Sequence, residues 1–308
     1  MLGRASRILV SRRFASTDEA SAVRTPQVEY TSDGFVVDSN PGQRKVLLKE
    51  WISPVSGRNF RLERAIPEDY DILTALWIRN FNETCNVVKL LKTEEREWLP
   101  VMGPMAANAL QFPATVLAFE ENKLVGSSHC SIQYAPDFDG RFGAYPVLGV
   151  DNPHLIIKAD YAKDVARFTF TPKVNTILAF LQTLEFNMLQ FYPNGIKKQA
   201  YLEASNVHPL RQQDGIGTVI IGQLVHEVFK QDCDIISTIA VATGTTRIAQ
   251  KAGYDILFQF PYEHYKVNGK VVFTDMYDGA KAASVVSVLN PKTWKGGPLR
   301  TSTTPYFM

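Results

Sequence analysis

Two hydrophobic periods alternate along the chain, and each change of period predicts a new element. Apolar residues spaced three and four apart predict helices, whereas strict alternation or a short apolar run predicts a strand. The predicted strands are 59–65, 114–120, 123–133, 199–207, 235–240, 257–266 and 270–275. The predicted helices are 74–86, 92–102, 175–190, 218–230, 243–253 and 279–289. Helices and strands are therefore expected to be mixed throughout the chain.

The segments between these elements differ in character. Residues 17–57 are polar and carry turn signals such as Asn40-Pro41-Gly42, so we predict a linker with short strands. Asn268-Gly269 between two strand patterns predicts a hairpin. Residues 134–160 are rich in Gly, Pro, Asp and aromatic side chains and form a longer connection than usual. Such loops are commonly functional.

Composition places the chain among ordinary globular proteins. It has 308 residues, of which 45% are hydrophobic and 21% charged. No apolar run approaches the ~18 residues that span a membrane, so membrane insertion is not expected. Cys85, Cys130 and Cys233 are far apart, and neither a Cys-x-x-Cys pair nor a His/Cys cluster occurs. A disulfide framework or a metal site is therefore not expected.

The net charge of +2 depends on the N-terminus. Residues 1–14 hold Arg4, Arg7, Arg12 and Arg13 and no acid, so the chain without them carries −2. A nearly neutral chain gives no electrostatic reason to expect nucleic-acid binding. Arginine and serine without an acid before Asp18 are typical of a mitochondrial transit peptide. We predict such a peptide at 1–16 and import into the matrix; the alternative is a disordered basic tail.

The strongest chemical signal is the loop Gln212-Gln213-Asp214-Gly215-Ile216-Gly217 between the predicted strand 199–207 and the helix 218–230. Glycines let the backbone approach an anion, and the free N–H groups of a helix start point at it. A P-loop is excluded because no lysine follows Gly222, and a dinucleotide fingerprint fails at Ile220.

The remaining pattern, Gln/Arg-x-x-Gly-x-Gly/Ala, is met by Gln212, Gly215 and Gly217. It resembles the pyrophosphate loop of the GCN5-related N-acetyltransferases (GNAT superfamily). Val207-His-Pro is similar to the end of that family's fourth strand, and Lys251-Ala-Gly-Tyr254 is similar to its Lys-x-Gly-Phe/Tyr signature. The resemblance implies an α/β fold with a central mixed, twisted sheet of about seven strands flanked by helices.

The resemblance also implies acetyl-CoA as co-substrate, no metal, and direct acetyl transfer without a covalent intermediate. Backbone amides near Ser205, Asn206 and Val207 would hold the pantetheine and polarise the carbonyl. The pyrophosphate would lie on Gln212, Gln213, Asp214, Gly215, Ile216, Gly217 and Thr218. Asp214 departs from the family, because a carboxylate beside a pyrophosphate is unfavourable unless it points outward.

The helix 175–190 and the closing Val-Asn-Gly-Lys-Val-Val-Phe hairpin resemble arylalkylamine N-acetyltransferases of the invertebrate type. This predicts acetylation of a primary amine, a small arylalkylamine, by a monomer or homodimer. The alternatives are a protein or peptide lysine acetyltransferase and an inactive acyl-CoA-binding regulator. The domain organisation predicted is 1–16 transit peptide, 17–58 extension, 59–290 acetyltransferase domain and 291–308 tail. Aromatic residues expected near the acceptor are Phe81, Tyr134, Phe138, Phe142, Tyr145 and Tyr262.

Two carboxylates are candidates for the general base. Glu83 lies where the invertebrate branch carries a Glu-Pro pair, but no proline follows it. In a register with one gap, Thr84 or Cys85 takes that position, and Glu83 is then a solvated helix carboxylate. Glu203 on the strand 199–207 is the second candidate; its alternative role is a charge on the rim of the cleft.

The general acid is less defined. The tyrosine that vertebrate-type relatives use corresponds to Ala249 here, whereas the invertebrate branch uses serines in the preceding turn. Thr243, Thr245 and Thr246 occupy that turn, and Thr245 is the candidate proton relay. Its alternative role is to cap the following helix.

Overall fold

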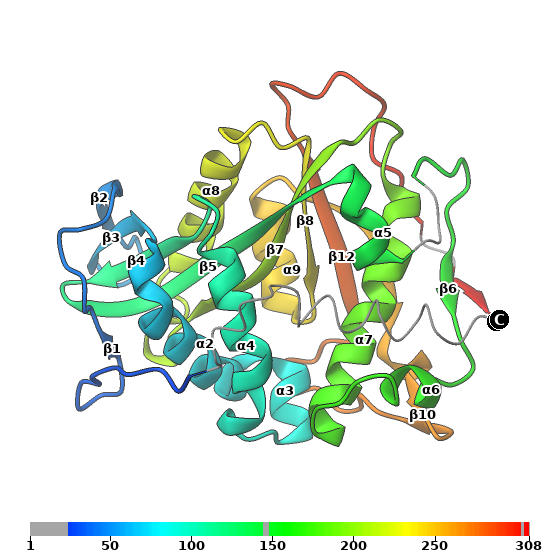
Figure 1. Cartoon of the computed structure of the whole chain (residues 1–308), viewed down its shortest axis with the longest axis horizontal. Helices are drawn as coiled ribbons and strands as arrows, with labels where there is room; N and C mark the ends of the chain where they lie inside the picture. Colours follow the sequence, from blue (N-terminus) through cyan, green and yellow to red (C-terminus); the bar gives the residue numbers. More distant parts are fainter. Residues whose placement is uncertain (1–23, 144–147, 303–304, 308) are drawn as a thin grey trace.

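The computed structural model describes residues 24–143, 148–302 and 305–307. In this part of the chain a nine-stranded sheet lies at the centre of the molecule, in the order β2-β3-β4-β5-β7-β8-β12-β9, with β1 paired to β5 (Figure 1). Its pairs are antiparallel except β7–β8, which is parallel. The strands are β1 (Val36–Val37), β2 (Val46–Ile52), β3 (Asn59–Arg64), β4 (Val116–Glu120), β5 (Lys123–Tyr134), β7 (Lys198–Val207), β8 (Ile235–Ala240), β9 (Asp255–Pro261) and β12 (Ala282–Leu289).

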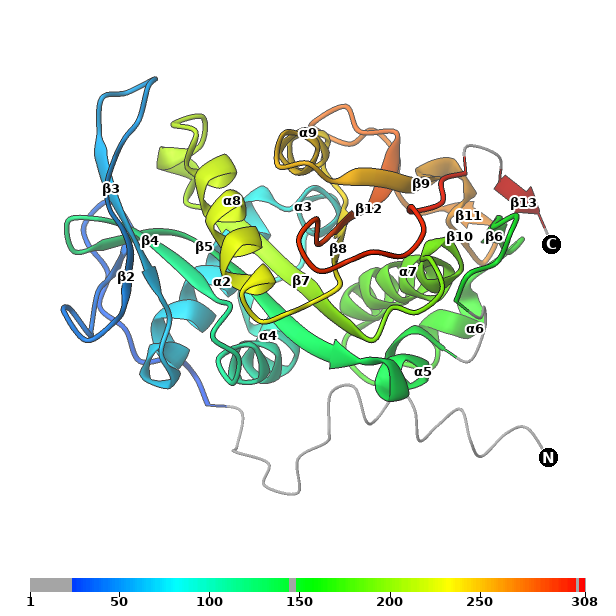
Figure 2. The ribbon, with the colours of Figure 1, turned by 90° about the horizontal axis from the view of Figure 1, so that it is seen from above.

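Helices cover both faces of this sheet (Figures 1 and 2). One face carries α2 (Tyr70–Thr84), α3 (Asn86–Leu91), α4 (Glu95–Ala109), α5 (Phe138–Phe142) and α7 (Pro172–Met188). The other carries α8 (Ile216–Phe229) and α9 (Thr243–Lys251). The buried apolar side chains accordingly form two clusters, one around Trp77 and Phe180 and one around Ile220 and Leu224. The predicted α/β fold with a mixed sheet is therefore confirmed.

The remaining elements are short. In the described ranges they are α6 (Ala162–Val165), β6 (Leu155–Ile157), β10 (Lys266–Val267), β11 (Lys270–Val271), β13 (Pro305–Phe307) and five 3₁₀ turns. The predicted turn at Asn268-Gly269 joins β10 to β11, although these strands are two residues each and β9 pairs with β12 instead. The long loop 134–160 contains α5 and β6.

The helix predicted at 279–289 is wrong, because this segment contains β12. The strand lies between β8 and β9 and pairs antiparallel with both. Ala283, Ser284, Val285, Val286 and Ser287 are all buried, since helices cover both faces of the sheet here. A strand buried on both faces shows no alternation, and hydrophobic period alone cannot distinguish it from a helix.

The segment before β3 contributes β1 and β2 to the sheet, which raises the strand count above the expected seven or so. Arg44 anchors this segment: its fully buried guanidinium lies 2.7 Å from Asp38, 2.6 Å from Asp69 and 3.1 Å from Glu63. Burial acts to lower the pKa of Arg44, but the hydrogen bonds and charges of Asp69 and Asp38 outweigh it and raise the pKa above its ordinary value. Arg44 is thus held as a cation.

The predicted transit peptide at 1–16 lies outside the described residues. Within the described ranges, no helix combines the length and the apolar character needed to cross a bilayer. The same residues contain no group of three His, Cys, Asp or Glu side chains placed to hold a metal ion.

Candidate functional site

The candidate site lies where the paired strands β7 and β8 diverge. The two strands are paired only between Gln199–Tyr201 and Ile235–Ser237. One further contact, from Thr238 Oγ1 to the Leu202 carbonyl at 2.9 Å, closes the pairing. β7 continues to Val207 with β5 as its partner. The edge of β7 that faces β8 therefore offers backbone hydrogen-bonding groups to a ligand.

A β-bulge lies at this point of β7. In the register with β5, Ala204 is opposite His129 and Leu202 is opposite Cys130, so Glu203 is the extra residue. Bulges redirect side chains and are enriched next to active sites. Here the bulge brings the side chain of Glu203 to the wall of a cavity.

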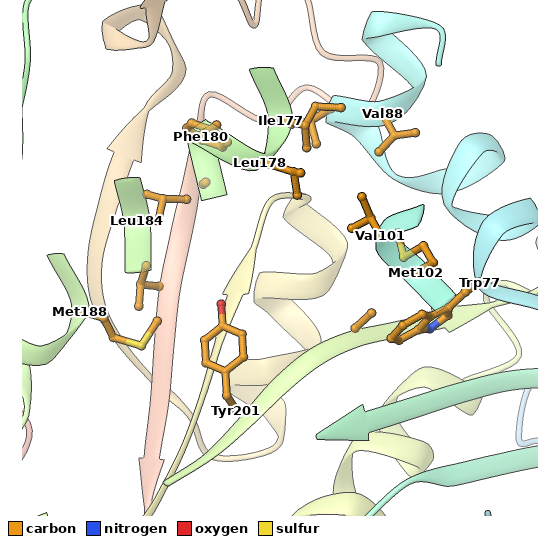
Figure 3. Packing of buried hydrophobic residues seen from close by; sticks show 14 of the residues in the cluster. Trp77, Val88, Val101, Met102, Ile177, Leu178, Phe180, Leu184, Met188 and Tyr201 are labelled. Carbon is orange, nitrogen blue, oxygen red and sulfur yellow. The ribbon is translucent and has the colours of Figure 1, made fainter. Parts of the chain in front are cut away.

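The cavity has a volume of about 160 Å³ and lies between β7, the start of α9 and the helices α2, α3, α4 and α7. Figure 3 shows Val88, Val101, Met102, Ile177 and Leu178 gathered from three helices on the side of the sheet that carries Tyr201. A dry cavity of roughly 150 Å³ lined by aliphatic and aromatic side chains holds benzene. This cavity therefore has room for about one ring or an aliphatic group of similar size.

Several residues predicted from the sequence line this cavity: Glu203, Ser205, Asn206 and Thr245. Asn206 is fixed by Asn80 of α2, whose side-chain amide donates to its Oδ1 at 3.0 Å. Helix α9 begins at Thr243 with Ala242 as its cap, so Thr245 lies inside the first turn rather than capping the helix.

Glu83 is placed differently. Its side chain is 49% exposed, 3.7 Å from Arg79, and outside the described cavity lining. The neighbouring Thr84 and Cys85 do line the cavity. Successive helical residues point about 100° apart, which separates Glu83 from Thr84 on α2, and Cys85 follows the end of that helix. Thr84 and Cys85 are the residues that the register with one gap would place at the site.

Glu203 is held by an ion pair that the sequence did not predict. Arg141 of α5 donates from Nη1 to Oε1 at 2.6 Å and from Nη2 to Oε2 at 2.8 Å. Ser131 also donates to Oε1 at 2.6 Å. The Glu203 side chain is only 6% exposed, so it is not a charge on the rim.

Arg141 also contacts a second carboxylate, Glu185 of α7, at 3.3 Å. Its guanidinium lies 3.9 Å from the centre of the Tyr201 ring. Burial acts to lower the pKa of Arg141, but the charges of Glu203 and Glu185 outweigh it and raise the pKa above its ordinary value. Sequence reasoning could have found Glu185, an acid on the apolar face of a predicted helix. No sequence pattern indicated Arg141, because the segment that contains it has the composition of a loop.

Most aromatic residues expected near the acceptor lie elsewhere. Phe81 lines the cavity, but Tyr134 is 50% exposed. Phe138, Phe142 and Tyr262 belong to the buried apolar core, and Tyr145 lies outside the described residues. The cavity wall is instead formed mainly by aliphatic residues and methionines of α3, α4 and α7.

The glycine-rich loop lies next to the end of β7. Gln213 and Gly215 adopt positive φ angles of 73° and 87°, and Gly215 caps α8. A β-carbon added at Gly217 would lie 3.2 Å from Ile248 and 3.8 Å from Val207. The side-chain amide of Gln212 donates to the Val207 carbonyl at 3.4 Å. No acid lies in the first turn of α8, which favours an anion there.

Strand β2 packs against this loop. The Ser53 hydroxyl donates to the Asp214 carbonyl at 2.7 Å, and the Trp51 ring would lie 3.2 Å from a β-carbon at Gly215. Asp214 is 9% exposed, so it does not point out into solvent as a phosphate site would require of a carboxylate. Ser53 and Asp214 are 161 positions apart, and no local pattern could have predicted their contact.

No protein-family model matches the sequence, and no curated protein matches it. Solved structures do match. Mosquito arylalkylamine N-acetyltransferase-like 5b and arylalkylamine N-acetyltransferase 2 from Aedes aegypti are 17% and 14% identical, each with a TM-score of 0.56. The Drosophila melanogaster polyamine N-acetyltransferase, which forms N-acetylagmatine, is 10% identical with a TM-score of 0.55. Each match covers 75% of this chain and 99% of the other. The chain thus has the fold of the GNAT acetyltransferases.

Proposed function

We propose that this chain is an acetyl-CoA-dependent N-acetyltransferase that moves an acetyl group directly to a small primary amine. One observation carries the proposal: Ser205 and Asn206 of β7 line the cavity, and the same strand ends at Val207 beside Gly217 in the glycine-rich start of α8. The split between β7 and β8 can bind an extended ligand and the helix start can bind its phosphates. The cavity beyond them can hold an acceptor.

Apart from the buried carboxylate of Asp214, whose charge opposes a pyrophosphate at this loop, the residues present fit acetyl-CoA, which when bound would supply the acetyl group as a thioester. The amides of Gln212–Thr218 would hold the pyrophosphate at the start of α8. The β7 backbone at Ser205, Asn206 and Val207 would pair with the pantetheine where β8 has turned away. Glycine at 217 keeps the helix start close to β7 and α9.

Acetyl transfer needs an amine without its extra proton and a proton for the departing thiolate. We assign proton acceptance to Glu203, because the bulge aims it at the cavity and Arg141 and Ser131 fix its position. We assign the hydroxyl near the thiolate to Thr245 in the first turn of α9. Glu83 is less suited, since it lies outside the described cavity lining.

The size and lining of the cavity support a compact apolar acceptor. Its wall is mainly aliphatic, and its volume suits about one ring. The structural neighbours named as arylalkylamine and polyamine N-acetyltransferases agree with a small amine. A protein lysine would need an open groove for the flanking peptide, whereas α3, α4 and α7 surround this cavity.

Gly217→Val tests the cofactor site. The added side chain would crowd Ile248 and Val207 and displace the start of α8, so we expect acetyl-CoA to bind at least about 10-fold more weakly by isothermal titration calorimetry. Gly222→Val is the matched control, since the same substitution on the same helix meets open space. Wild-type affinity in Gly217→Val would show that the loop does not bind acetyl-CoA.

A competition between amines distinguishes the proposed function from its two alternatives, a protein acetyltransferase and an inactive acyl-CoA-binding regulator. Tyramine, tryptamine, a polyamine and a lysine peptide are offered together with limiting acetyl-CoA, and the acetylated products are quantified by mass spectrometry. We expect acetyltyramine or acetyltryptamine to dominate. Preference for the peptide would favour a protein acetyltransferase. Acetyl-CoA binding without any product would favour an inactive regulator.

We also propose that the protein acts in the mitochondrial matrix. The support is the run of arginines without an acid in residues 1–14. A reporter fused to residues 1–30 should enter mitochondria, because the matrix potential draws positive charge inward. Replacing Arg4, Arg7, Arg12 and Arg13 by glutamine is the control and should leave the reporter in the cytosol. A cytosolic reporter with the unchanged segment would contradict the proposal.

A further inference from the structure

We infer that Glu185, Arg141 and Glu203 form a binding site for the ammonium group of the acceptor amine. In this arrangement Glu185 determines specificity and Arg141 is a positioning residue. The inference rests on the proposed function in one respect, that the ligand of the cavity is the acetyl acceptor. Its experiments measure amine binding directly, without acetyl-CoA.

The charged part of the described cavity wall is entirely acidic. Glu185 from α7 and Glu203 from β7 are the only ionisable Asp, Glu, Lys, Arg or His side chains in that lining. Glu185 is 1% exposed and the Glu203 side chain 6%. Carboxylates taken out of water need positive charge or N–H donors nearby. A cationic ligand entering the cavity would supply both.

Arg141 holds the two carboxylates side by side. Its Nη2 atom is 2.8 Å from Glu203 Oε2 and 3.3 Å from Glu185 Oε1. The guanidinium comes from α5 and is not part of the described lining. Its planar fork fixes both acids in relation to each other. The three side chains together carry one negative charge, which an ammonium group with its three N–H donors would balance.

The rest of the described cavity lining is mainly apolar. Val101, Met102 and Leu178 belong to α4 and α7 and line the same space as the two acids. A ligand that matches both kinds of wall has one ammonium group and one compact apolar group. Neutral analogues would lose the ion pair with the acids. Analogues with an added carboxylate, such as an amino acid in place of its amine, would be repelled by the acids.

A matched pair of probes tests the site in the wild-type chain. Tyramine and 4-ethylphenol have similar ring systems, but only tyramine carries an ammonium group. In calorimetric titrations without acetyl-CoA we expect tyramine to bind at least about 10-fold more tightly, as charge-assisted hydrogen bonds would give. Equal affinities, or no binding of tyramine, would overturn the inference.

Glu185→Gln tests the residue itself, because it keeps the shape of the side chain and removes its charge. Tyramine affinity should fall roughly 10- to 100-fold. The KM for tyramine should rise in proportion, while acetyl-CoA affinity stays within about twofold of wild type. Unchanged acetyl-CoA binding also shows that the variant is folded. Glu263→Gln is the control, since that side chain is 77% exposed.

The outcomes separate this inference from the proposed function. Acetyl transfer with wild-type tyramine affinity in Glu185→Gln would overturn the inference and leave the proposed function intact. Charge-selective tyramine binding without any acetyl transfer would support the site and contradict the proposed function. If Glu185→Gln does not fold, the comparison of tyramine with 4-ethylphenol on the wild-type chain decides.

Discussion

Arg44 and Arg141 are largely buried arginines that each pair with acidic side chains, and the two groups of acids face different surroundings. Arg44 bonds Asp38, Asp69 and Glu63 inside packed protein at the base of β2. Arg141 bonds Glu203 and Glu185, and both of these acids line a cavity. Each arginine has a raised pKa because nearby acids outweigh its burial. Ion pairing alone therefore does not mark the functional site.

Net charge does not separate the two clusters either. With Arg61, which lies 2.7 Å from Glu63, the Arg44 cluster has two cations and three acids and carries one negative charge. The Arg141 cluster carries the same charge. In the Arg44 cluster, the backbone N–H of Ile66 and the side-chain amide of Asn40 also bond Asp69. Access to a cavity is the difference that indicates binding.

The largest effect is expected from Arg44→Leu. The substitution removes a cation that pairs with three buried acids and leaves Arg61 beside only Glu63 and Asp38, which should lower the free energy of unfolding by about 3–5 kcal/mol in urea titrations. Arg58→Leu is the control: that arginine side chain is 47% exposed, and its pair with Glu120 should be worth about 0–1 kcal/mol. A loss in Arg44→Leu no larger than in the control would contradict a structural role for the cluster.

Arg141→Lys should have its main effect on catalysis. Lysine keeps the charge but loses the two parallel bonds to Glu203, so the carboxylate is held less well. We expect kcat to fall on the order of 10- to 100-fold, as for misplaced catalytic groups, with acetyl-CoA affinity unchanged. A wild-type kcat together with a large loss of stability would make this cluster structural, like that of Arg44.

The sequence predicted the parts of the site that depend on local pattern. The strand, glycine loop and helix from 199 to 230 were found because turn and helix-start chemistry is written in adjacent residues. Arg141 and Glu203 are 62 positions apart and meet only when α5 packs below β7. Ser53 reaches Asp214 across 161 positions. Contacts between residues so far apart in the sequence depend on tertiary packing, which the pattern of neighbouring residues does not reveal.

His129 is a third buried basic side chain, and it shows how burial changes a pKa when no acidic partner outweighs it. It is completely buried on β5, and its ring contacts that of Trp77. In the described structure neither ring nitrogen has a hydrogen-bond partner. Burial alone lowers the pKa of His129 well below its ordinary value of 6.5. Arg44 and Arg141, with acids beside them, shift in the opposite direction.

This contrast predicts a pH dependence of stability. In the folded chain His129 stays neutral as the pH falls below 6.5, whereas in the unfolded chain it takes up a proton, so acid favours unfolding. The contribution is present above pH 6.5 and is lost below it, by up to about 1.4 kcal/mol per pH unit. His129→Leu should therefore reduce the drop in stability between pH 6.5 and 5.5 in urea titrations. His226→Gln, on the exposed face of α8, should leave that drop unchanged. An identical drop in His129→Leu would show that this ring is charged or solvated in the folded chain.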